Sequence, residues 1–289
     1  MKLYLADWEA ANSLLTNTKE IVRNILTTYY YNKDIQFYKQ MKLENKNVFL
    51  DSGAFSAWSQ KKEINIFQYA QFLHKVKEYV EVYATLDSIG DYKKTMENTK
   101  YLESEGLSPL PCFHYGEPIT ILDKYVDKYE YIALGGMVPI STPQLMFWLD
   151  DIFHRHPKVK FHGFGLTTLF LIKRYPWYSV DSSSWCSGGK FERVIIKDRT
   201  FDFGRDQSSP DAWTKQSSYI QEYYKEILQK EYNITPEELF NSYKRRNDVN
   251  VLSFLQIEKE LTLNPPKIFQ KPQMEFFDIS LIGKREEEK

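Results

Sequence analysis

The sequence predicts an α/β fold: a (β/α)8 barrel of the TIM type, followed by a C-terminal helical extension. Short apolar runs alternate with longer amphipathic segments, a pattern typical of strand–helix units around a parallel sheet. The runs are nearly continuous in apolar residues, as strands buried on both faces are. The length of 289 residues is close to that of a barrel domain, roughly 250 residues. An open doubly wound sheet is the alternative.

Eight apolar runs are the expected strands, and they cover residues 3–6, 47–51, 82–87, 110–114, 131–135, 159–163, 178–181 and 193–196. The segments between them predict helices, clearest at 64–79 and 92–105, and a helical region up to about Tyr30 follows the first run. No Gly-x-Gly-x-x-Gly motif follows that run, which disfavours a dinucleotide-binding version of the open sheet.

The character of the chain changes after Thr200, where strand-like runs give way to helical patterns. We expect two parts, a barrel over residues 1–205 and a helical extension over 206–289 that packs on it. Within the extension, 211–230 and 249–261 are the expected helices.

Composition restricts the class of protein. Charged residues make up 27% of the chain and hydrophobic residues 42%, which indicates a globular and not a disordered chain. The net charge of −1 neither supports nor excludes a nucleic-acid partner. Two cysteines, Cys112 and Cys186, are too few for a disulfide framework or a four-cysteine zinc site, and they fit a reducing compartment. Because the chain has no long apolar stretch and no signal-like start, we expect a cytoplasmic protein without a membrane partner.

Three of the expected strands end in aspartate, at Asp51, Asp87 and Asp181. Catalytic groups in barrels lie where strands end and the following loops begin. A single aspartate at such a place is most simply a turn former or a helix cap. Three on separate strands would converge on one rim, where carboxylates repel each other and lose hydration. That arrangement indicates a ligand or a reaction that uses them.

Glycines and histidines mark the same rim. Gly135-Gly136 and Gly163-Phe164-Gly165 follow expected strands, where glycine lets the backbone approach a flat ligand or simply permits a tight turn. His114 and His162 also end strands and could reach the pocket.

The order of these motifs resembles the tRNA-guanine (queuine/archaeosine) transglycosylase superfamily, and within it the phage-type deazaguanine DNA transglycosylases. Asp51-Ser52-Gly53-Ala54-Phe55 is similar to the family motif Asp-Ser-Gly-Gly-Phe. The other matched positions are Asp87, Gly135-Gly136, the glycine-containing run from His162 to Gly165, and Asp181, which stands where the family has its nucleophile. The resemblance covers roughly residues 47–185 and departs from the family near His114–Glu117, where the family has a glutamine.

The resemblance implies exchange of guanine for a 7-deazaguanine base in a polynucleotide, through a covalent sugar–enzyme intermediate. Asp181 would be the nucleophile at C1′, and Asp51 the general acid and then the general base. Asp87 would accept hydrogen bonds from guanine, while Phe55 or Tyr115 would stack on the base, which must first leave its own stack. The full set of expected substrate-binding residues is Asp87, Ser52, Phe55, His114, Tyr115, Gly135, Gly136 and Gly163.

Two departures from the tRNA enzymes narrow the expected partner. Those enzymes carry a zinc site of three cysteines and one histidine, and a basic segment after the nucleophile, and this chain has neither. We therefore expect no structural zinc, no cofactor, and DNA ahead of tRNA as the polynucleotide, with a phage-infected bacterium as a possible host. The alternatives are a tRNA-guanine transglycosylase, a nucleoside or nucleotide glycosidase that uses water, and a non-catalytic base-binding module. The sequence leaves the oligomeric state open.

Overall fold

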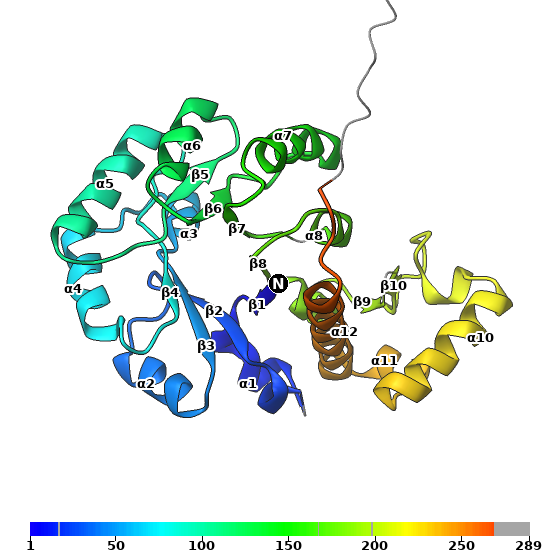
Figure 1. The fold of residues 1–289 in the computed structure, drawn as a ribbon. Coiled ribbons are helices and arrows are strands. Elements are labelled where there is room, and N and C mark those ends of the chain that lie inside the picture. The colour runs from blue at the N-terminus through cyan, green and yellow to red at the C-terminus, as the bar shows by residue number, and fades with distance from the viewer. Residues whose placement is uncertain (17, 167, 198, 269–289) are drawn as a thin grey trace, which may run out of the picture.

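Eight parallel strands form one curled sheet in the computed structural model, which describes residues 1–268 apart from 17, 167 and 198. The strands are β1 (Lys2–Leu5), β2 (Asn24–Thr28), β3 (Asn47–Asp51), β4 (Val82–Tyr83), β5 (Cys112–His114), β6 (Tyr131–Gly135), β7 (Lys160–Gly163) and β8 (Ser179–Ser182). Their order in the sheet is β4-β3-β2-β1-β8-β7-β6-β5. Figure 1 looks along the strands and shows the helices arranged around the outside of the curl.

The two edge strands of the sheet, β4 and β5, approach each other at one point. A parallel bridge pairs Ala84 with Leu110. Leu110 N donates to Tyr83 O at 2.8 Å, and Thr85 N donates to Leu110 O at 2.9 Å. The expected α/β class with a parallel sheet is thus confirmed, and the curl of the sheet makes the fold TIM-like.

The prediction is wrong for one strand of this sheet. Residues 193–196 do form a strand, β9 (Arg193–Ile196), but it pairs antiparallel with β10 (Arg199–Asp202) in a separate two-stranded sheet. The strand that the prediction missed is β2 (24–28), which lies in the region that was expected to be helical up to about Tyr30. Pairing with both β1 and β3 gives β2 its place in the sheet. Such pairing is a tertiary effect that local residue pattern does not encode.

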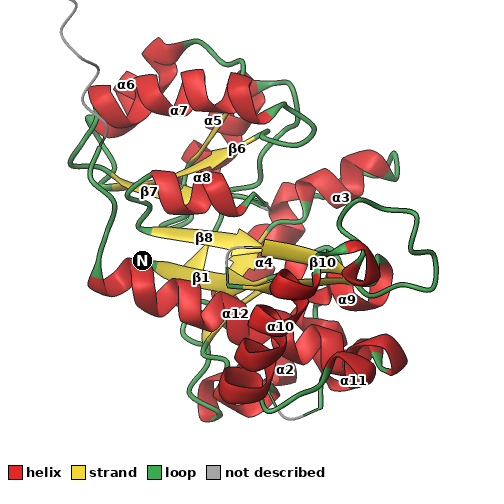
Figure 2. Ribbon diagram, turned by 90° about the vertical axis from the view of Figure 1, so that its right-hand side faces the viewer, coloured by secondary structure: helices red, strands yellow, loops and turns green. Residues whose placement is uncertain are grey.

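Helices cover the outer face of the sheet, as the side view in Figure 2 shows. The helices of the described residues are α1 (Ala11–Leu14), α2 (Ile35–Leu43), α3 (Ala54–Ser59), α4 (Ile66–Val76), α5 (Tyr92–Ser104), α6 (Ile119–Val126), α7 (Thr142–Arg155), α8 (Leu169–Arg174), α9 (Ser187–Lys190), α10 (Ser218–Ile227), α11 (Pro236–Asn241) and α12 (Tyr243–Leu263). Of these, α10 and α11 pack with β9 and β10 and not on the eight-stranded sheet. The helices expected at 64–79 and 92–105 are confirmed as α4 and α5. The helix expected at 211–230 is shorter, because α10 begins at Ser218 and a π-helical segment, Leu228–Tyr232, follows it.

The last long helix, α12, packs against the start of β1 and β2. Leu3 N donates to Oε1 of Glu258 at 2.9 Å, and Nδ2 of Asn24 donates to the same oxygen. This one carboxylate therefore joins α12 to β1 and β2. In Figure 1 α12 lies beside β1, in agreement with these contacts. The expected helix at 249–261 is confirmed as part of α12.

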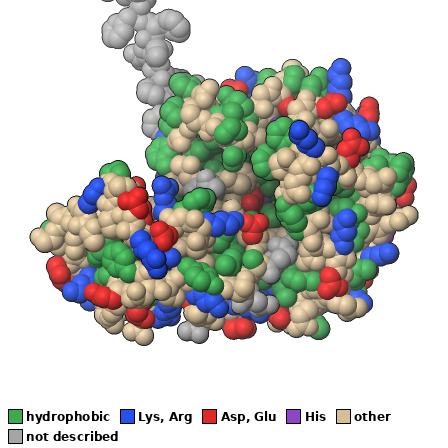
Figure 3. All heavy atoms as spheres, turned by 180° about the vertical axis from the view of Figure 1, so that it is seen from behind, with side chains coloured by type: hydrophobic (Ala, Val, Ile, Leu, Met, Phe, Trp, Pro, Cys, Tyr) green, Lys and Arg blue, Asp and Glu red, His purple; other side chains and the backbone are tan. Residues whose placement is uncertain are grey.

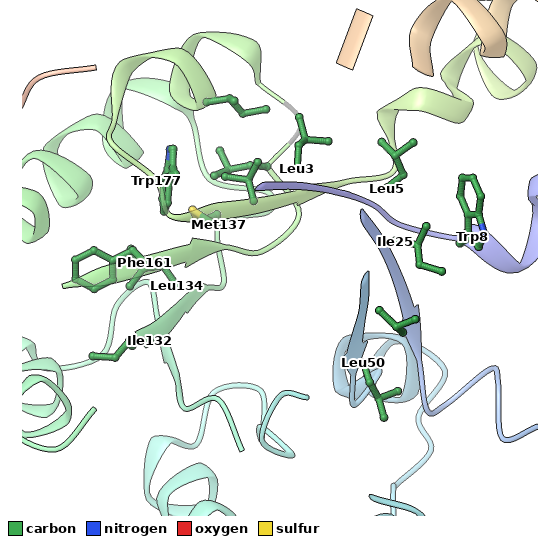
Figure 4. Packing of buried hydrophobic residues seen from close by; sticks show 14 of the residues in the cluster. Leu3, Leu5, Trp8, Ile25, Leu50, Ile132, Leu134, Met137, Phe161 and Trp177 are labelled. Atoms are coloured by element: carbon green, nitrogen blue, oxygen red, sulfur yellow. The ribbon is translucent and has the colours of Figure 1, made fainter. Parts of the chain in front are cut away.

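Buried side chains form three clusters. The largest lies between the sheet and its helices, and Figure 4 shows its strand residues, among them Leu134 and Phe161, projecting from the outer face of the sheet. A smaller cluster, which includes Tyr4 and Phe49, fills the inside of the curl. The third joins β9 and β10 to α10, α11 and α12. Alternation of side chains along each strand divides the first two clusters between its faces.

No helix in the described part of the chain combines the length and the apolar character that a bilayer crossing requires.

Candidate active site

The carboxyl ends of the parallel strands form one face of the molecule, and the three aspartates predicted for the site lie there: Asp51 and Asp181, expected to be catalytic, and Asp87, expected to bind the base. Asp51 is the last residue of β3, and Asp181 lies in β8. Asp87 follows β4, which ends already at Tyr83, so the strand expected over 82–87 is shorter than predicted. Figure 3 faces these strand ends and shows hydrophobic side chains around a hollow in which acidic side chains are visible.

Asp51 is held by the turn that follows β3. Its Oδ2 atom accepts a hydrogen bond from Gly53 N at 3.0 Å. Gly53 has a φ of 77°, and a Cβ atom there would lie 2.5 Å from Cβ of Tyr30, so the turn requires glycine. Burial, and next the charge of Asp87, raise the pKa of Asp51 to about 7, while the Gly53 hydrogen bond opposes the rise and Asp181 adds to it. Such a carboxyl can give or take a proton at neutral pH.

Asp87 is held by two side-chain donors. Ser52 Oγ lies 3.1 Å from its Oδ1 atom, and Nε2 of His114 lies 3.0 Å from its Oδ2 atom. The other ring nitrogen of His114 lies 3.0 Å from Oε1 of Glu117, so the imidazole sits between two carboxylates. Burial by itself lowers the pKa of His114, but Cys112 and the hydrogen bonds to the neighbours raise it well above the usual value. A charged His114 donates to Asp87 and to Glu117 at once.

Helix α5 fixes the loop that carries Asp87. Nδ2 of Asn98 donates to Leu86 O at 2.8 Å, and the hydroxyls of Thr85 and Thr99 lie 2.8 Å apart. These contacts are buried, so the loop is positioned even though β4 has already ended.

Asp181 is 6% exposed and is held on one oxygen. Its Oδ1 atom accepts a hydrogen bond from Gly165 N at 2.9 Å and lies 3.2 Å from Nε2 of His162. His162 pairs in register with Ser179, and Asp181 follows two residues later on the same face of β8. Burial lowers the pKa of His162, and hydrogen bonding to Asp181 partly offsets the effect.

The remaining side chains expected to bind the base differ in their surroundings. Ser52 is fully buried, and its hydroxyl both approaches Asp87 and accepts a hydrogen bond from Ala54 N. Phe55 is exposed at the rim, with its ring 5.9 Å from that of Trp58. Tyr115 is partly buried, and its ring lies against Trp148 of α7 at 5.5 Å. Stacking of Phe55 or Tyr115 on a base therefore stays a prediction, and the more exposed Phe55 is better placed for it.

The three glycines expected at the site make room for neighbouring side chains. A Cβ atom on Gly135 would lie 2.9 Å from the His114 ring, and one on Gly136 would lie 3.2 Å from Cβ of the same residue. A Cβ atom on Gly163 would lie 2.2 Å from Cδ1 of Leu166. The absence of side chains at Gly135 and Gly136 thus leaves room for His114 beside Asp87. The absence of one at Gly163 leaves room for Leu166. Hydrogen bonds from their backbone to a base stay a prediction.

A group of possible metal ligands lies within this site. Ligand atoms of Asp87, Cys112 and His114 all lie within 4.8 Å of one another. In the same group, Nε2 of His114 lies 3.4 Å from Sγ of Cys112, and burial raises the pKa of that thiol to about 11. The donors are therefore hydrogen-bonded to each other, and both the thiol and the imidazolium would have to lose a proton to bind a metal.

Two contacts of the site were not expected from the sequence. Glu117 binds the far side of His114, and the backbone N–H of Gly165 binds Asp181. Glu117 stands three residues after His114 in the loop that departs from the family pattern, and that spacing was the available signal.

The comparisons with known proteins add no family to this geometry. No model of a known protein family matches the chain. A search of curated proteins also gives no match.

Proposed function

We propose that this chain is a glycosyltransferase that exchanges guanine for a 7-deazaguanine base in a polynucleotide. It would act through a covalent glycosyl-aspartate intermediate on a fully closed (β/α)8 barrel. The observation that carries the proposal is that Asp51, Asp87 and Asp181 lie together at the carboxyl ends of the strands, where the charges of Asp87 and Asp181 help to raise the pKa of Asp51. A carboxyl that holds its proton near neutral pH, on the same rim as a second carboxyl that can act as nucleophile, is the pair that this chemistry needs.

The proposed reaction has two displacements. In the first, a carboxylate oxygen of Asp181 bonds to C1′ while the C1′–N9 bond breaks, and protonated Asp51 gives its proton to the departing guanine. In the second, Asp51 takes the N–H proton of the incoming base, whose nitrogen bonds to C1′ as the bond to Asp181 breaks. The sugar keeps its configuration because it is inverted twice. No metal or cofactor is required by these steps.

Recognition of the base falls to Asp87. A carboxylate can accept hydrogen bonds from both the N1–H and the amino group of guanine. Its partners Ser52 and His114 hold the two oxygens in place. The contact of 3.0 Å with Nε2 of His114 fixes one oxygen of Asp87 without removing the second lone pair of that oxygen.

Exposed aromatic rings at the rim support a polynucleotide substrate. Tyr31 follows β2, and Phe55 and Trp58 follow β3; all three are exposed. Gln60 donates to the hydroxyl of Tyr31 at 2.9 Å, so the two loops are joined. Exposed aromatic rings stack on unpaired bases without regard to sequence. We place DNA ahead of tRNA because the basic segment expected after the nucleophile of tRNA enzymes is absent, and we place the reaction in the cytoplasm.

Base exchange tests the proposal directly. The purified chain is incubated with labelled guanine and, separately, with single-stranded DNA, duplex DNA and tRNA. We expect label to enter DNA and to be displaced by a 7-deazaguanine. Asp181→Asn should abolish entry of the label, because an amide cannot attack C1′ usefully. Asp127→Asn is the matched control, since Asp127 is exposed at the end of α6.

Three results would contradict parts of the proposal. Label that enters tRNA alone makes tRNA the substrate. Release of guanine without exchange identifies a glycosidase, in which water is the second nucleophile. Binding of guanine with neither release nor exchange identifies a binding module.

A further inference from the structure

The structure assigns a positioning role to His162: its Nε2–H holds one oxygen of Asp181, so that the other oxygen faces the sugar. This inference rests on the proposed function, because it concerns the nucleophile of that reaction. It adds a residue outside the set expected to act on the substrate, and it identifies the attacking atom.

His162 is a fully buried polar side chain inside the curl of the sheet. Its ring stacks on Phe49 with centroids 4.4 Å apart and meets Phe164 edge-on at 4.6 Å. Burial of a polar group among apolar rings is costly unless its hydrogen bonds are made. Both ring nitrogens do have partners: Nδ1 lies 2.7 Å from Ser179 Oγ, and Nε2 lies 3.2 Å from Oδ1 of Asp181.

The donors in this chain of contacts can be assigned. Burial lowers the pKa of His162, so its ring is neutral at neutral pH and has one donor nitrogen and one acceptor nitrogen. A carboxylate only accepts, so the donor is Nε2 and the acceptor is Nδ1. Ser179 then donates to Nδ1, and its oxygen accepts from the hydroxyl of Tyr131, 2.6 Å away. Burial raises the pKa of Tyr131, which keeps this last donor protonated.

The direction of these hydrogen bonds has a consequence for Asp181. The neutral Nε2–H and the backbone N–H of Gly165 both bind Oδ1. Neither donor uses Oδ2, and we assign Oδ2 as the atom that bonds to C1′. A neutral donor also leaves the negative charge of the carboxylate uncompensated. An imidazolium would form an ion pair with it and make it a weaker nucleophile.

Substitution of His162 tests the role through the two kinetic constants. His162→Leu replaces the imidazole with an apolar side chain of similar bulk and removes the donor. We expect kcat for base exchange to fall roughly 10- to 100-fold, because a misplaced nucleophile loses its alignment. KM for the free base should change less than about threefold, since Asp87 and not Asp181 binds the base. His162→Gln, whose amide N–H can reach Asp181, should recover most of the lost kcat.

Two further measurements keep the inference open to refutation. Nitrogen-15 spectra of the imidazole should show the proton on Nε2 in the unmodified chain, and Ser179→Ala should disturb that preference and reduce kcat by less than His162→Leu does. His74→Leu, at an exposed position of α4, is the matched control and should exchange base normally. Thermal unfolding of each variant identifies any loss of activity that comes from instability. If His162→Leu does not fold, Ser179→Ala and His162→Gln take its place in the test.

The outcomes separate this inference from the proposed function. An unmodified chain without exchange activity removes both. An active chain whose kcat is unchanged in His162→Leu, or whose KM for the base rises as much as kcat falls, removes the positioning role alone. A proton on Nδ1 in the unmodified chain also overturns it.

Discussion

Nε2 of His114 lies 3.0 Å from Oδ2 of Asp87, and the same imidazole binds Glu117 through its other nitrogen. The charge of Asp87 is the second cause, after burial, of the raised pKa of Asp51. In the proposed reaction, recognition of the base and protonation of the acid would therefore be linked. The residue that would bind guanine also helps to raise the pKa of Asp51.

The pH dependence of guanine release should reveal that link. Asp51 must be protonated to assist the leaving base, so the rate should fall as the pH rises through about 7. Asp87→Asn removes the charge that raises this pKa, and the fall should then begin at lower pH. The measurement is single-turnover guanine release at saturating substrate between about pH 5 and pH 9, with Asp127→Asn as the control. An unchanged profile in Asp87→Asn would show that the charge of Asp87 does not raise the pKa of Asp51.

The same raised pKa predicts a change in stability with pH. A carboxyl whose pKa is higher in the folded state binds protons more readily there. Its favourable contribution to the free energy of unfolding is therefore complete below the pKa of the unfolded chain and is lost as the pH rises to about 7. A rise from 3.8 to about 7 corresponds to at most about 4 kcal/mol. Asp51→Asn should therefore raise the melting temperature at pH above about 8 and have a smaller effect near pH 5.

Thermal melts of the unmodified chain and Asp51→Asn at both pH values test this expectation. Asp127→Asn, with the same chemical change at the surface, should give no such pH-dependent difference. Equal effects of Asp51→Asn at the two pH values would mean that ionisation of Asp51 does not destabilise the fold.

Some features of the site could be predicted from the sequence because parallel strands end at a common edge. Asp51 and Asp181 close apolar runs, and period-two alternation gives each a definite face of the sheet. The hydrogen-bond partners of the buried histidines could not be predicted. Contact between His162 and Asp181 depends on the register of β7 and β8, which is set by the packing of the whole sheet.

The wrong strand prediction has a similar cause. Arg193–Ile196 is strand-forming by composition, and it does form a strand, but its partner is β10 and not β8 or β1. Asn24–Thr28 contains polar residues at both ends and follows a region with helical patterning, so it gives a weak local signal. Its neighbours β1 and β3 complete the backbone hydrogen bonds that make it a strand.

The close packing around Gly163 predicts a packing role that differs from the base-binding role expected from the sequence. Gly163→Ala would bring Cβ within 2.2 Å of Leu166 and 3.1 Å of Trp177. Such overpacking should destabilise the fold by about 1–3 kcal/mol. Gly189→Ala is the matched control, because its Cβ would make ordinary contacts at 3.5 Å and beyond.

Chemical denaturation measures the stability of both variants, and titration with guanine measures base affinity. We expect Gly163→Ala to be less stable and to bind the base with unchanged affinity once folded. Reduced affinity at unchanged stability would instead support the base-binding role of Gly163.

The Asp87–Cys112–His114 group allows a specific prediction about the metal content of the protein. Zinc binds thiolate and neutral imidazole, but burial raises the pKa of the Cys112 thiol to about 11, and the neighbours of His114 raise the pKa of the imidazole. Both protons would have to be displaced, and the ion pair with Asp87 would be lost. We therefore expect no stoichiometric zinc in the purified chain after a chelator wash, and no loss of base exchange. Added zinc should bind weakly, more tightly as the pH rises, and should inhibit exchange by occupying Asp87. Cys112→Ser should weaken that inhibition and Cys186→Ser should not, because Cys186 lies outside the group. Elemental analysis that finds one zinc per chain after washing, and none in Cys112→Ser, would make this group a metal centre and would require another residue to recognise the base.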